Sequence, residues 1–91
     1  PVKKFEDLSF TAASLRLDCI INGMLRSGRD KAVSLIESRL VFVNNALIIK
    51  ADYKIKLNDT VTIKGFGKYQ IDYAEISGRK DRYLLLAKHF L

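Results

Sequence analysis

A chain of 91 residues is long enough for one domain with a modest hydrophobic core. Its formal net charge of +6 indicates a polyanionic partner, while a hydrophobic share of 48% is ordinary for a globular protein. One cysteine excludes an internal disulfide, and one cysteine with one histidine argues against a metal site. No apolar run approaches the roughly 18 residues that cross a bilayer, and no signal-peptide pattern opens the chain. We therefore expect a cytoplasmic protein without a membrane partner.

Residues 1–13 show no sustained periodicity, and we predict that they form an N-terminal arm or linker. Phe5, Leu8 and Phe10 are apolar anchors that would let this arm fold back on the core. The chain begins at Pro1 rather than at methionine, which suggests a piece of a longer protein.

Two short amphipathic helices are predicted between residues 14 and 38. Apolar residues recur there with the i, i+3, i+4, i+7 spacing of one helix face: Leu17, Ile20, Ile21 and Met24, and then Ala32, Leu35 and Ile36. Ser14 is expected to cap the first helix, and Ser27 with Asp30 resembles a capping box at the start of the second. Cys19 lies beside the first apolar stripe, so we expect it to be a buried hydrophobic residue.

The unusual feature is a concentration of cations where the second helix begins. Arg26, Arg29 and Lys31 lie close to its N-terminus, where the helix dipole disfavours cations and favours a bound anion. Arg16, in front of the first helix, belongs to the same exposed stripe. We predict a phosphate site there, with Arg16 and Arg29 as forked ligands. The alternative is that these cations are only solvated and are offset by Asp30.

Asp18 is a carboxylate among these cations. Because a carboxylate repels phosphate, we expect Asp18 to hold Arg16 or a backbone donor instead of contacting the anion. The phosphate-site hypothesis also requires the guanidinium groups of Arg16 and Arg29 to lie on one side of the molecule, without being locked in internal ion pairs.

Strand patterns follow the helices. Residues 40–43 are rich in β-branched side chains, and Asn44-Asn45 is a two-residue turn into a second strand over residues 46–49. After a polar loop, residues 60–64 alternate as a half-buried strand does. Two helices followed by strands predict an α+β domain, with the helices packed on a small, mostly antiparallel sheet.

Residues 65–91 are predicted to add a C-terminal β-hairpin to the same domain. Strand-forming residues are concentrated at 69–76 and 82–90, with a basic turn at 77–81 between them. Phe66 is flanked by glycines, which indicates a bend where the backbone closely approaches another group.

Several motifs at fixed spacings resemble the RNA-binding domain first seen in ribosomal small-subunit protein S-four. They are Arg16-Leu17-Asp18, Arg29 three positions before Ala32, Leu35-Ile36, and Val41-Phe42-Val43-Asn44. The resemblance covers residues 15–64. It implies an S-four-type RNA-binding domain over residues 14–64, with the alpha-L RNA-binding motif of two short helices on a sheet.

The departures from this family fall at turns. Three family glycines are replaced by Arg39, Asn45 and Asn58. Asparagine is the non-glycine residue that best tolerates a left-handed backbone, so two of these turns are expected to survive. At Arg39 we expect either a differently bent turn or an added phosphate contact. Gly28 stands where the family has serine, although Ser27 is next to it.

The glycine-flanked Phe66 and the hairpin after it are similar to the C-terminal part of the YlmH-like family of bacterial ribosome-associated proteins. This resemblance implies that an N-terminal domain of the parent chain is missing here. It also implies a role on the large ribosomal subunit, near tRNA or ribosomal RNA, and suggests the rescue of stalled translation.

We therefore predict a non-catalytic RNA-binding module that recognises structured RNA, either rRNA or tRNA, by its shape and 2′-hydroxyls. The sequence has no glycine-rich cofactor loop and no paired catalytic carboxylates with a base, so we expect no enzyme activity, cofactor or small-molecule substrate within these residues. The predicted RNA-binding residues are Arg16, Arg26, Ser27, Gly28, Arg29, Lys31, Arg39, Asn44 and Asn45.

Two other function classes stay open at this point. The chain is alternatively the RNA-recognition domain of a larger RNA-modifying enzyme or tRNA ligase, or a protein-interaction domain that uses the hairpin edge. Lysines over residues 50–56 and the cations of residues 79–82 are more typical of a solvated surface, and the tyrosines of a core or sheet face. His89, which has no companion acid or nucleophile, is expected at the surface.

Overall fold

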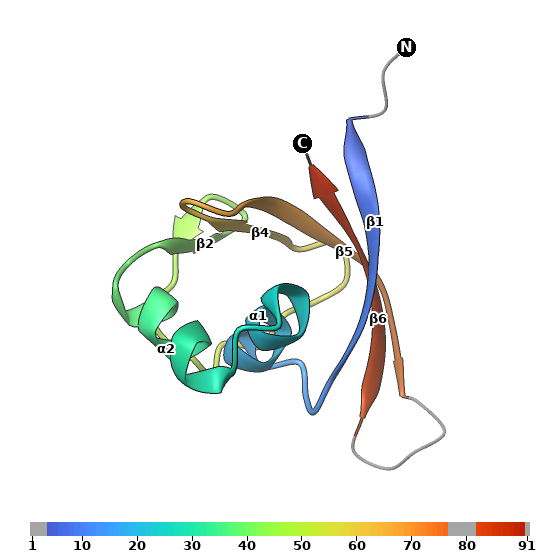
Figure 1. Ribbon diagram of the computed structural model, residues 1–91, viewed down its shortest axis with the longest axis horizontal. Coiled ribbons are helices and arrows are strands. Elements are labelled where there is room, and N and C mark those ends of the chain that lie inside the picture. The colour runs from blue at the N-terminus through green and yellow to red at the C-terminus, as the bar shows by residue number, and fades with distance from the viewer. Residues whose placement is uncertain (1–3, 77–81, 91) are drawn as a thin grey trace.

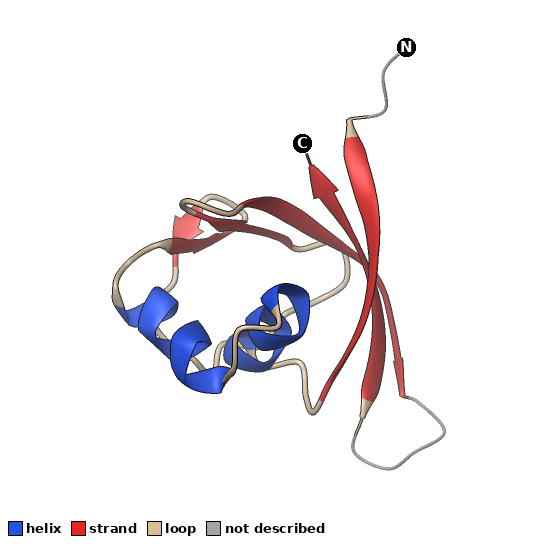
Figure 2. Cartoon of the chain, viewed as in Figure 1, coloured by secondary structure: helices blue, strands red, loops and turns tan. Residues whose placement is uncertain are grey.

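Two short helices lie against one face of a curved six-stranded antiparallel sheet, which confirms the predicted α+β class (Figures 1 and 2). The computed structural model describes residues 4–76 and 82–90. The strand order across the sheet is β1-β6-β5-β4-β2-β3. The elements are β1 (Phe5–Ala12), α1 (Leu17–Leu25), α2 (Arg29–Glu37), β2 (Val41–Val43), β3 (Ala46–Leu47), β4 (Thr60–Ile63), β5 (Gly67–Ile76) and β6 (Tyr83–Phe90).

The segment predicted as an arm or linker contains an edge strand. β1 pairs with β6 along its whole length, from Phe5 opposite Phe90 to Ala12 opposite Tyr83. Phe10 is buried in the core, so one of the predicted anchors does fold back. The strand was missed because its partner lies at the other end of the chain, and local periodicity carries no information about that pairing.

Both helices bury the predicted apolar faces. Leu17, Ile20 and Ile21 of α1 are fully buried, as are Ala32 and Ile36 of α2. The two helices and the inward-facing residues of the strands form one hydrophobic cluster, which includes Cys19 as expected. The concave side of the sheet therefore encloses the core (Figure 1).

The predicted caps are wrong at both helix starts. The N-cap of α1 is Arg16, and Ser14 accepts the backbone N–H of Arg16 at 3.2 Å without capping a helical residue. The N-cap of α2 is Gly28, with φ of 87°, and no side chain caps this helix. The hydroxyl of Ser27 donates to the Gly28 carbonyl at 3.1 Å and accepts no N–H from the first turn of α2.

The turns that replaced family glycines keep a left-handed backbone. Asn45 and Asn58 have φ of 70° and 69°, which confirms the expectation for asparagine. Arg39 has φ of 65°, so this turn keeps the same conformation and is not bent differently. The Asn44-Asn45 pair, with φ of 52° and 70°, forms the tight turn between β2 and β3.

The C-terminal hairpin is central to the sheet. β5 pairs with β4 through its first half, and β6 lies between β5 and β1. The hairpin edge named in the protein-interaction alternative is therefore covered on the β6 side. The predicted basic turn at 77–81 lies outside the described residues. β3 covers only Ala46–Leu47, which is shorter than the predicted strand over residues 46–49.

A close approach does occur at the glycine-flanked bend. Gly67 has φ of 125°, and a Cβ atom there would lie 2.7 Å from Nε2 of His89. The His89 ring stacks on the buried Tyr69 ring, with 4.3 Å between centroids, and its Nε2 lies 3.2 Å from the Phe66 carbonyl oxygen. His89 is therefore half-buried and partnered, which corrects the expectation of a surface residue.

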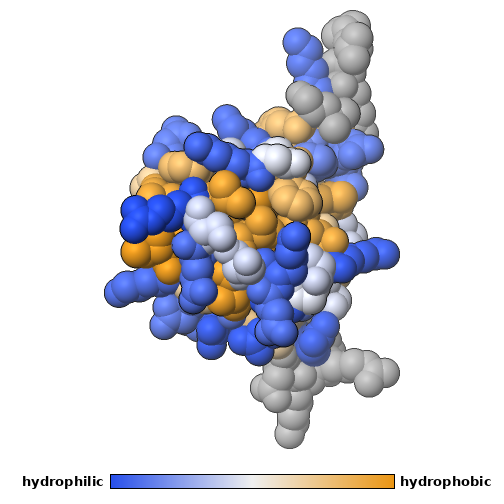
Figure 3. Space-filling model, turned by 60° about the vertical axis from the view of Figure 1, so that its left-hand side comes forward, coloured by the Kyte–Doolittle hydropathy of each residue, from blue (hydrophilic) through white to orange (hydrophobic). Residues whose placement is uncertain are grey.

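Figure 3 turns the α2 and β2 end of the molecule toward the viewer. Apolar side chains gather there, but hydrophilic side chains surround and cross them. The large exposed apolar residues that lie between β2 and β4 in the sequence are Leu47, Ile49 and Leu57. This end therefore presents a mixed surface, not an uninterrupted apolar one.

Candidate functional site

Two of the predicted phosphate ligands meet at one carboxylate. Arg16 donates to Asp18 through Nε at 3.2 Å and through Nη2 at 3.0 Å. Arg29 donates through Nη2 to the Oδ2 atom of Asp18 at 3.2 Å. The two guanidinium groups therefore lie on one side of the molecule, and the predicted role of Asp18 in holding Arg16 is confirmed. We call this group the Asp18 cluster: Arg16, Asp18 and Arg29.

The cluster contradicts one requirement of the phosphate-site hypothesis, because both arginines form internal ion pairs. They nevertheless remain open to solvent. The Asp18 side chain is 1% exposed, whereas those of Arg16 and Arg29 are 37% and 57% exposed. Arg29 uses only its Nη2 atom on Asp18, and a guanidinium group has five N–H donors. The inner edge of each arginine is held while an outer edge faces water.

The start of α1 is fixed by the loop that precedes β4. The backbone N–H groups of Leu17 and Asp18 donate to the carbonyls of Tyr53 and Ala51, at 2.8 and 3.1 Å. The Ile55 N–H donates to the Leu15 carbonyl at 2.9 Å. The first two backbone N–H groups of α1 therefore have acceptors within the protein, and the Asp18 backbone is held in place beside the arginines.

The charge balance of the cluster follows from burial and hydrogen bonding. Burial alone raises the pKa of Asp18, but hydrogen bonds from Arg29 and Arg16 outweigh it, so the pKa lies below the ordinary value of 3.8. The same contact with Asp18 raises the pKa of Arg29. At neutral pH the cluster holds two cations and one anion, which leaves a net positive charge directed toward solvent.

The start of α2 lies beside this cluster. Arg29 is its first residue, and Asp30 and Lys31 complete an exposed first turn. The Gly28 N–H donates to the side-chain oxygen of Asn22 at 2.9 Å, which ties α2 to the last turns of α1. The positive end of the α2 dipole therefore adds to the field of the arginines.

The other predicted residues separate into two groups. Arg26, Ser27 and Gly28 connect α1 to α2, and Arg26 is exposed with φ of 53°. Arg39 lies beyond the far end of α2, about 12 Å of helix away from Arg29. Asn44 and Asn45 lie at the β2–β3 turn, also away from the α2 start.

Asn44 is committed to the fold. Its Nδ2 donates to Oδ1 of the buried Asp59 at 3.0 Å, and its Oδ1 accepts the Thr60 N–H at 3.0 Å. Asp59 in turn accepts the Lys56 N–H at 2.8 Å. This network explains the left-handed turn, and it uses both ends of the amide that we expected to contact phosphate or ribose.

The remaining basic and aromatic candidates lie outside the Asp18 cluster. Lys50, Lys54 and Lys56 are exposed on the loop before β4. Tyr69 is buried, so it does not offer a stacking surface. Arg82 donates to the Thr11 hydroxyl at 2.9 Å, whereas the cations at 79 and 80 lie outside the described residues.

Residues 4–76 and 82–90 contain no group of three or more His, Cys, Asp or Glu side chains arranged to hold a metal ion. In the same part of the chain, neither helix has the length and apolar character needed to span a membrane.

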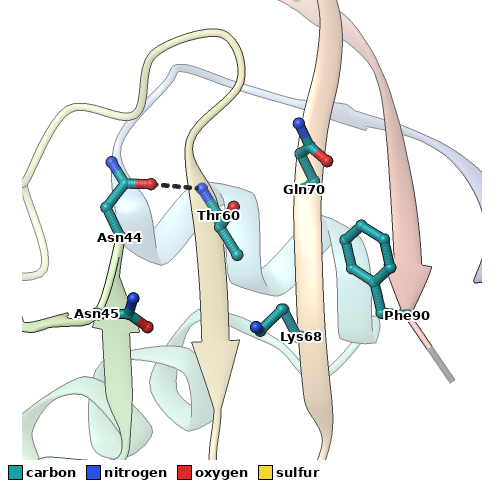
Figure 4. Close-up of a pocket in the computed structure, with 6 residues that line it drawn as sticks. All are labelled: Asn44, Asn45, Thr60, Lys68, Gln70 and Phe90. Carbon is teal, nitrogen blue, oxygen red and sulfur yellow. Dashed lines mark hydrogen bonds between the residues drawn. The ribbon is translucent and has the colours of Figure 1, made fainter.

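Sequence reasoning missed a pocket on the opposite face of the sheet. Asn44, Asn45, Thr60, Lys68, Gln70 and Phe90 line it (Figure 4). These residues come from the β2–β3 turn and from β4, β5 and β6, and strand pairing brings them together. Only the two asparagines were among the predicted site residues.

No family model matches the sequence. The chain is similar to ribosome-associated protein quality control protein P2 of Bacillus subtilis (strain 168), with 33% identity over 73 residues. The match covers 80% of this chain but only 28% of that protein. The chain thus resembles part of a bacterial protein that carries ribosome association in its name.

Proposed function

We propose that this chain is a non-catalytic RNA-binding module of the S-four type that recognises structured RNA, either rRNA or tRNA, on the large ribosomal subunit. The observation that carries the proposal is the Asp18 cluster, in which one buried carboxylate holds two exposed guanidinium groups side by side. The name of the Bacillus subtilis relative supports the association with ribosomes.

Asp18 changes the expected mechanism. Its carboxylate orients Arg16 and Arg29, so their free N–H donors are already directed outward before RNA binds. Preorganised guanidinium groups lose less side-chain entropy when they bind phosphate oxygens in forked geometry. The net charge of the cluster stays positive, so an anionic backbone is attracted and not repelled.

The α2 start extends this surface. Arg26, Ser27, Gly28 and Lys31 lie close to Arg29 in the sequence, and the first-turn N–H groups of α2 favour an anion. Such a surface contacts phosphates and riboses, and it therefore reads the shape of a double-helical region. Under this proposal Arg39 is an outer member of the interface, whereas Asn44 and Asn45 line a pocket on the opposite face of the sheet.

The decisive experiment measures the affinity of the 91-residue chain for a short blunt-ended RNA duplex across a salt series. Arg29→Lys keeps the charge and removes the fork, whereas Arg29→Gln removes both. We expect Arg29→Gln to weaken binding about 10-fold or more, and Arg29→Lys to fall between it and the wild type. Lys4→Gln removes one exposed cation before β1 and is the matched control, with affinity close to that of the wild type.

Loss of Arg16 and Arg29 together leaves the buried Asp18 carboxylate without a cationic partner, which destabilises the fold. The triple variant Arg16→Gln/Asp18→Asn/Arg29→Gln removes all three charges and avoids this cost. A folded triple variant that binds the duplex as tightly as the wild type would refute the proposed site. An RNA affinity that does not change with salt would count against phosphate contacts and favour the protein-interaction alternative, because phosphate contacts give a slope of about 0.9 per phosphate neutralised.

A further inference from the structure

The convex face of the sheet carries a row of side chains that includes three phenylalanines and a lysine. Among the described residues, both helices pack on the concave side and leave this face uncovered (Figures 1 and 2). Val61 and Tyr69 point into the core, so their neighbours Thr62 and Lys68 point outward. Strand pairing aligns one outward residue from each strand: Leu47, Phe42, Thr62, Lys68, Phe90 and Phe5.

The pocket missed by sequence reasoning lies on this face. It is open, with a volume of about 680 Å³, which is within the range of small-ligand sites. Figure 4 shows the Phe90 ring beside the β5 strand, with Gln70 above it and Lys68 directed toward Asn45 and Thr60. Among the residues that the structure describes, no acidic side chain lines the pocket.

Two more lysines lie close to aromatic rings of this face. The Lys64 ammonium lies 5.6 Å from the centre of the Phe42 ring, and the Lys88 ammonium lies 5.1 Å from that of Phe5. Lys88 is paired with Asp72 at 3.2 Å, whereas Lys68 has an exposed side chain that faces the pocket. Aromatic rings among lysines form a surface that suits a ligand with both a flat ring and a negative charge.

We infer that this pocket binds an unpaired nucleotide of an RNA strand. The base stacks on the Phe90 ring, and its phosphate pairs with the Lys68 ammonium. The Gln70 and Asn45 amides lie within the same pocket and supply both donors and acceptors to the base edge. Stacking with amide contacts tolerates several bases, so we expect little sequence preference.

An unpaired nucleotide fits better than a peptide strand or an apolar ligand. A peptide that adds a strand needs a sheet edge, but β4, β5 and β6 are all interior strands. An apolar ligand would leave the ammonium group and the amides of the pocket unpaired. The inference rests on the proposed function only in its choice of RNA as partner, because the pocket and the Asp18 cluster are different surfaces.

The test uses the 91-residue chain and two fluorescent probes: a short oligouridine and the blunt-ended RNA duplex. Phe90→Leu keeps apolar volume and removes the aromatic face, and Lys68→Gln keeps length and removes the charge. We expect each to weaken oligouridine binding at least about 5-fold, and Lys68→Gln to lower the salt slope by about 0.7. Lys50→Gln removes one exposed cation outside the pocket and should leave oligouridine binding unchanged.

The two probes separate the two proposals. Oligouridine binding that is unaffected by both pocket variants would overturn the nucleotide pocket, even if Arg29→Gln still weakens duplex binding. If Arg29→Gln leaves duplex affinity unchanged while Phe90→Leu and Lys68→Gln weaken oligouridine binding, the Asp18-cluster site is overturned and the nucleotide pocket is supported. Phe90 packs edge-to-face on Phe5, so thermal unfolding is used to check that Phe90→Leu is folded. The Lys68→Gln variant changes an exposed side chain and gives an independent readout.

Discussion

Arg16 and Arg29 donate from their Nη2 atoms to the same oxygen of Asp18, at 3.0 and 3.2 Å. One arginine precedes α1 and the other begins α2, so this carboxylate joins the starts of both helices. The contact positions both cations and also stabilises the fold. Because Asp18 positions both arginines, we expect its removal to lower RNA affinity, whereas the change in net charge alone predicts a higher affinity.

Asp18→Asn should lower RNA affinity although it raises the net positive charge. The substitution weakens the hydrogen bonds that hold Arg16 and Arg29, so both side chains gain rotamer freedom that binding must remove. We expect duplex affinity to fall about 3-fold to 10-fold and the free energy of unfolding to fall by about 1–3 kcal/mol. Fluorescence anisotropy and urea denaturation measure the two effects.

The matched control for this prediction is Asp52→Asn. Asp52 is exposed in the loop before β4, and its removal changes the net charge by the same amount. Electrostatic attraction alone predicts that both variants bind RNA more tightly. A gain in affinity in Asp18→Asn equal to that in Asp52→Asn would show that Asp18 does not position the arginines.

The contribution of Asp18 to stability should disappear in acid. Its pKa in the folded protein lies below 3.8, because the hydrogen bonds from Arg29 and Arg16 outweigh its burial. The unfolded chain therefore binds the proton at a higher pH than the folded protein does. The stabilisation is complete well above pH 3.8 and declines as the pH falls through the folded-state pKa. The difference in unfolding free energy between wild type and Asp18→Asn should thus be largest near pH 7 and shrink toward pH 3. A difference that does not change with pH would contradict the ion pairs.

Local sequence patterns predicted the helices and strands in which buried residues recur at a regular spacing. Ile20 and Ile21 follow the helical spacing of a buried face, and Val61 follows the alternation of a half-buried strand. β1 was missed because only its pairing with β6 makes it a strand. The central place of the hairpin was missed for the same reason, since β1, which pairs with β6, lies near the other end of the chain.

For the site, too, local contacts could be predicted from the sequence and contacts between distant segments could not. The partnership of Arg16 and Asp18 is local and was anticipated, whereas the contact of Arg29 with Asp18 depends on how α1 packs beside α2. The pocket around Lys68 and Phe90 depends on strand register, because these residues become neighbours only through the pairing of β5 with β6. Patterns of nearby residues contain neither kind of information.

Arg39→Gly should stabilise the protein. Arg39 has φ of 65°, a left-handed conformation that is unfavourable for residues with a Cβ atom and readily adopted by glycine. We expect the free energy of unfolding to rise by about 0.5–1 kcal/mol, because the relieved strain exceeds the entropy that glycine adds to the unfolded chain. Arg39→Ala keeps the Cβ atom and removes the same charge, so it should give no such gain. Equal effects of glycine and alanine would attribute the change to charge instead of backbone strain. RNA affinity measured on the same pair tests whether Arg39 also contacts phosphate.

Gly23→Ala should destabilise the protein, which reverses the usual effect of this change inside a helix. Alanine is favoured over glycine in helix interiors by about 1 kcal/mol. At this position, however, a Cβ atom would lie 2.5 Å from Cδ2 of Phe10 and 2.9 Å from the Thr11 carbonyl oxygen. α1 therefore packs directly against β1, and the added methyl group must push the two apart. We expect the free energy of unfolding to fall by about 1–3 kcal/mol, measured by urea denaturation. Ser34→Ala, at an exposed position of α2, reports the helix-propensity effect alone and should be neutral or stabilising. A stability gain in Gly23→Ala that matches this control would mean that β1 is not packed on α1 in solution.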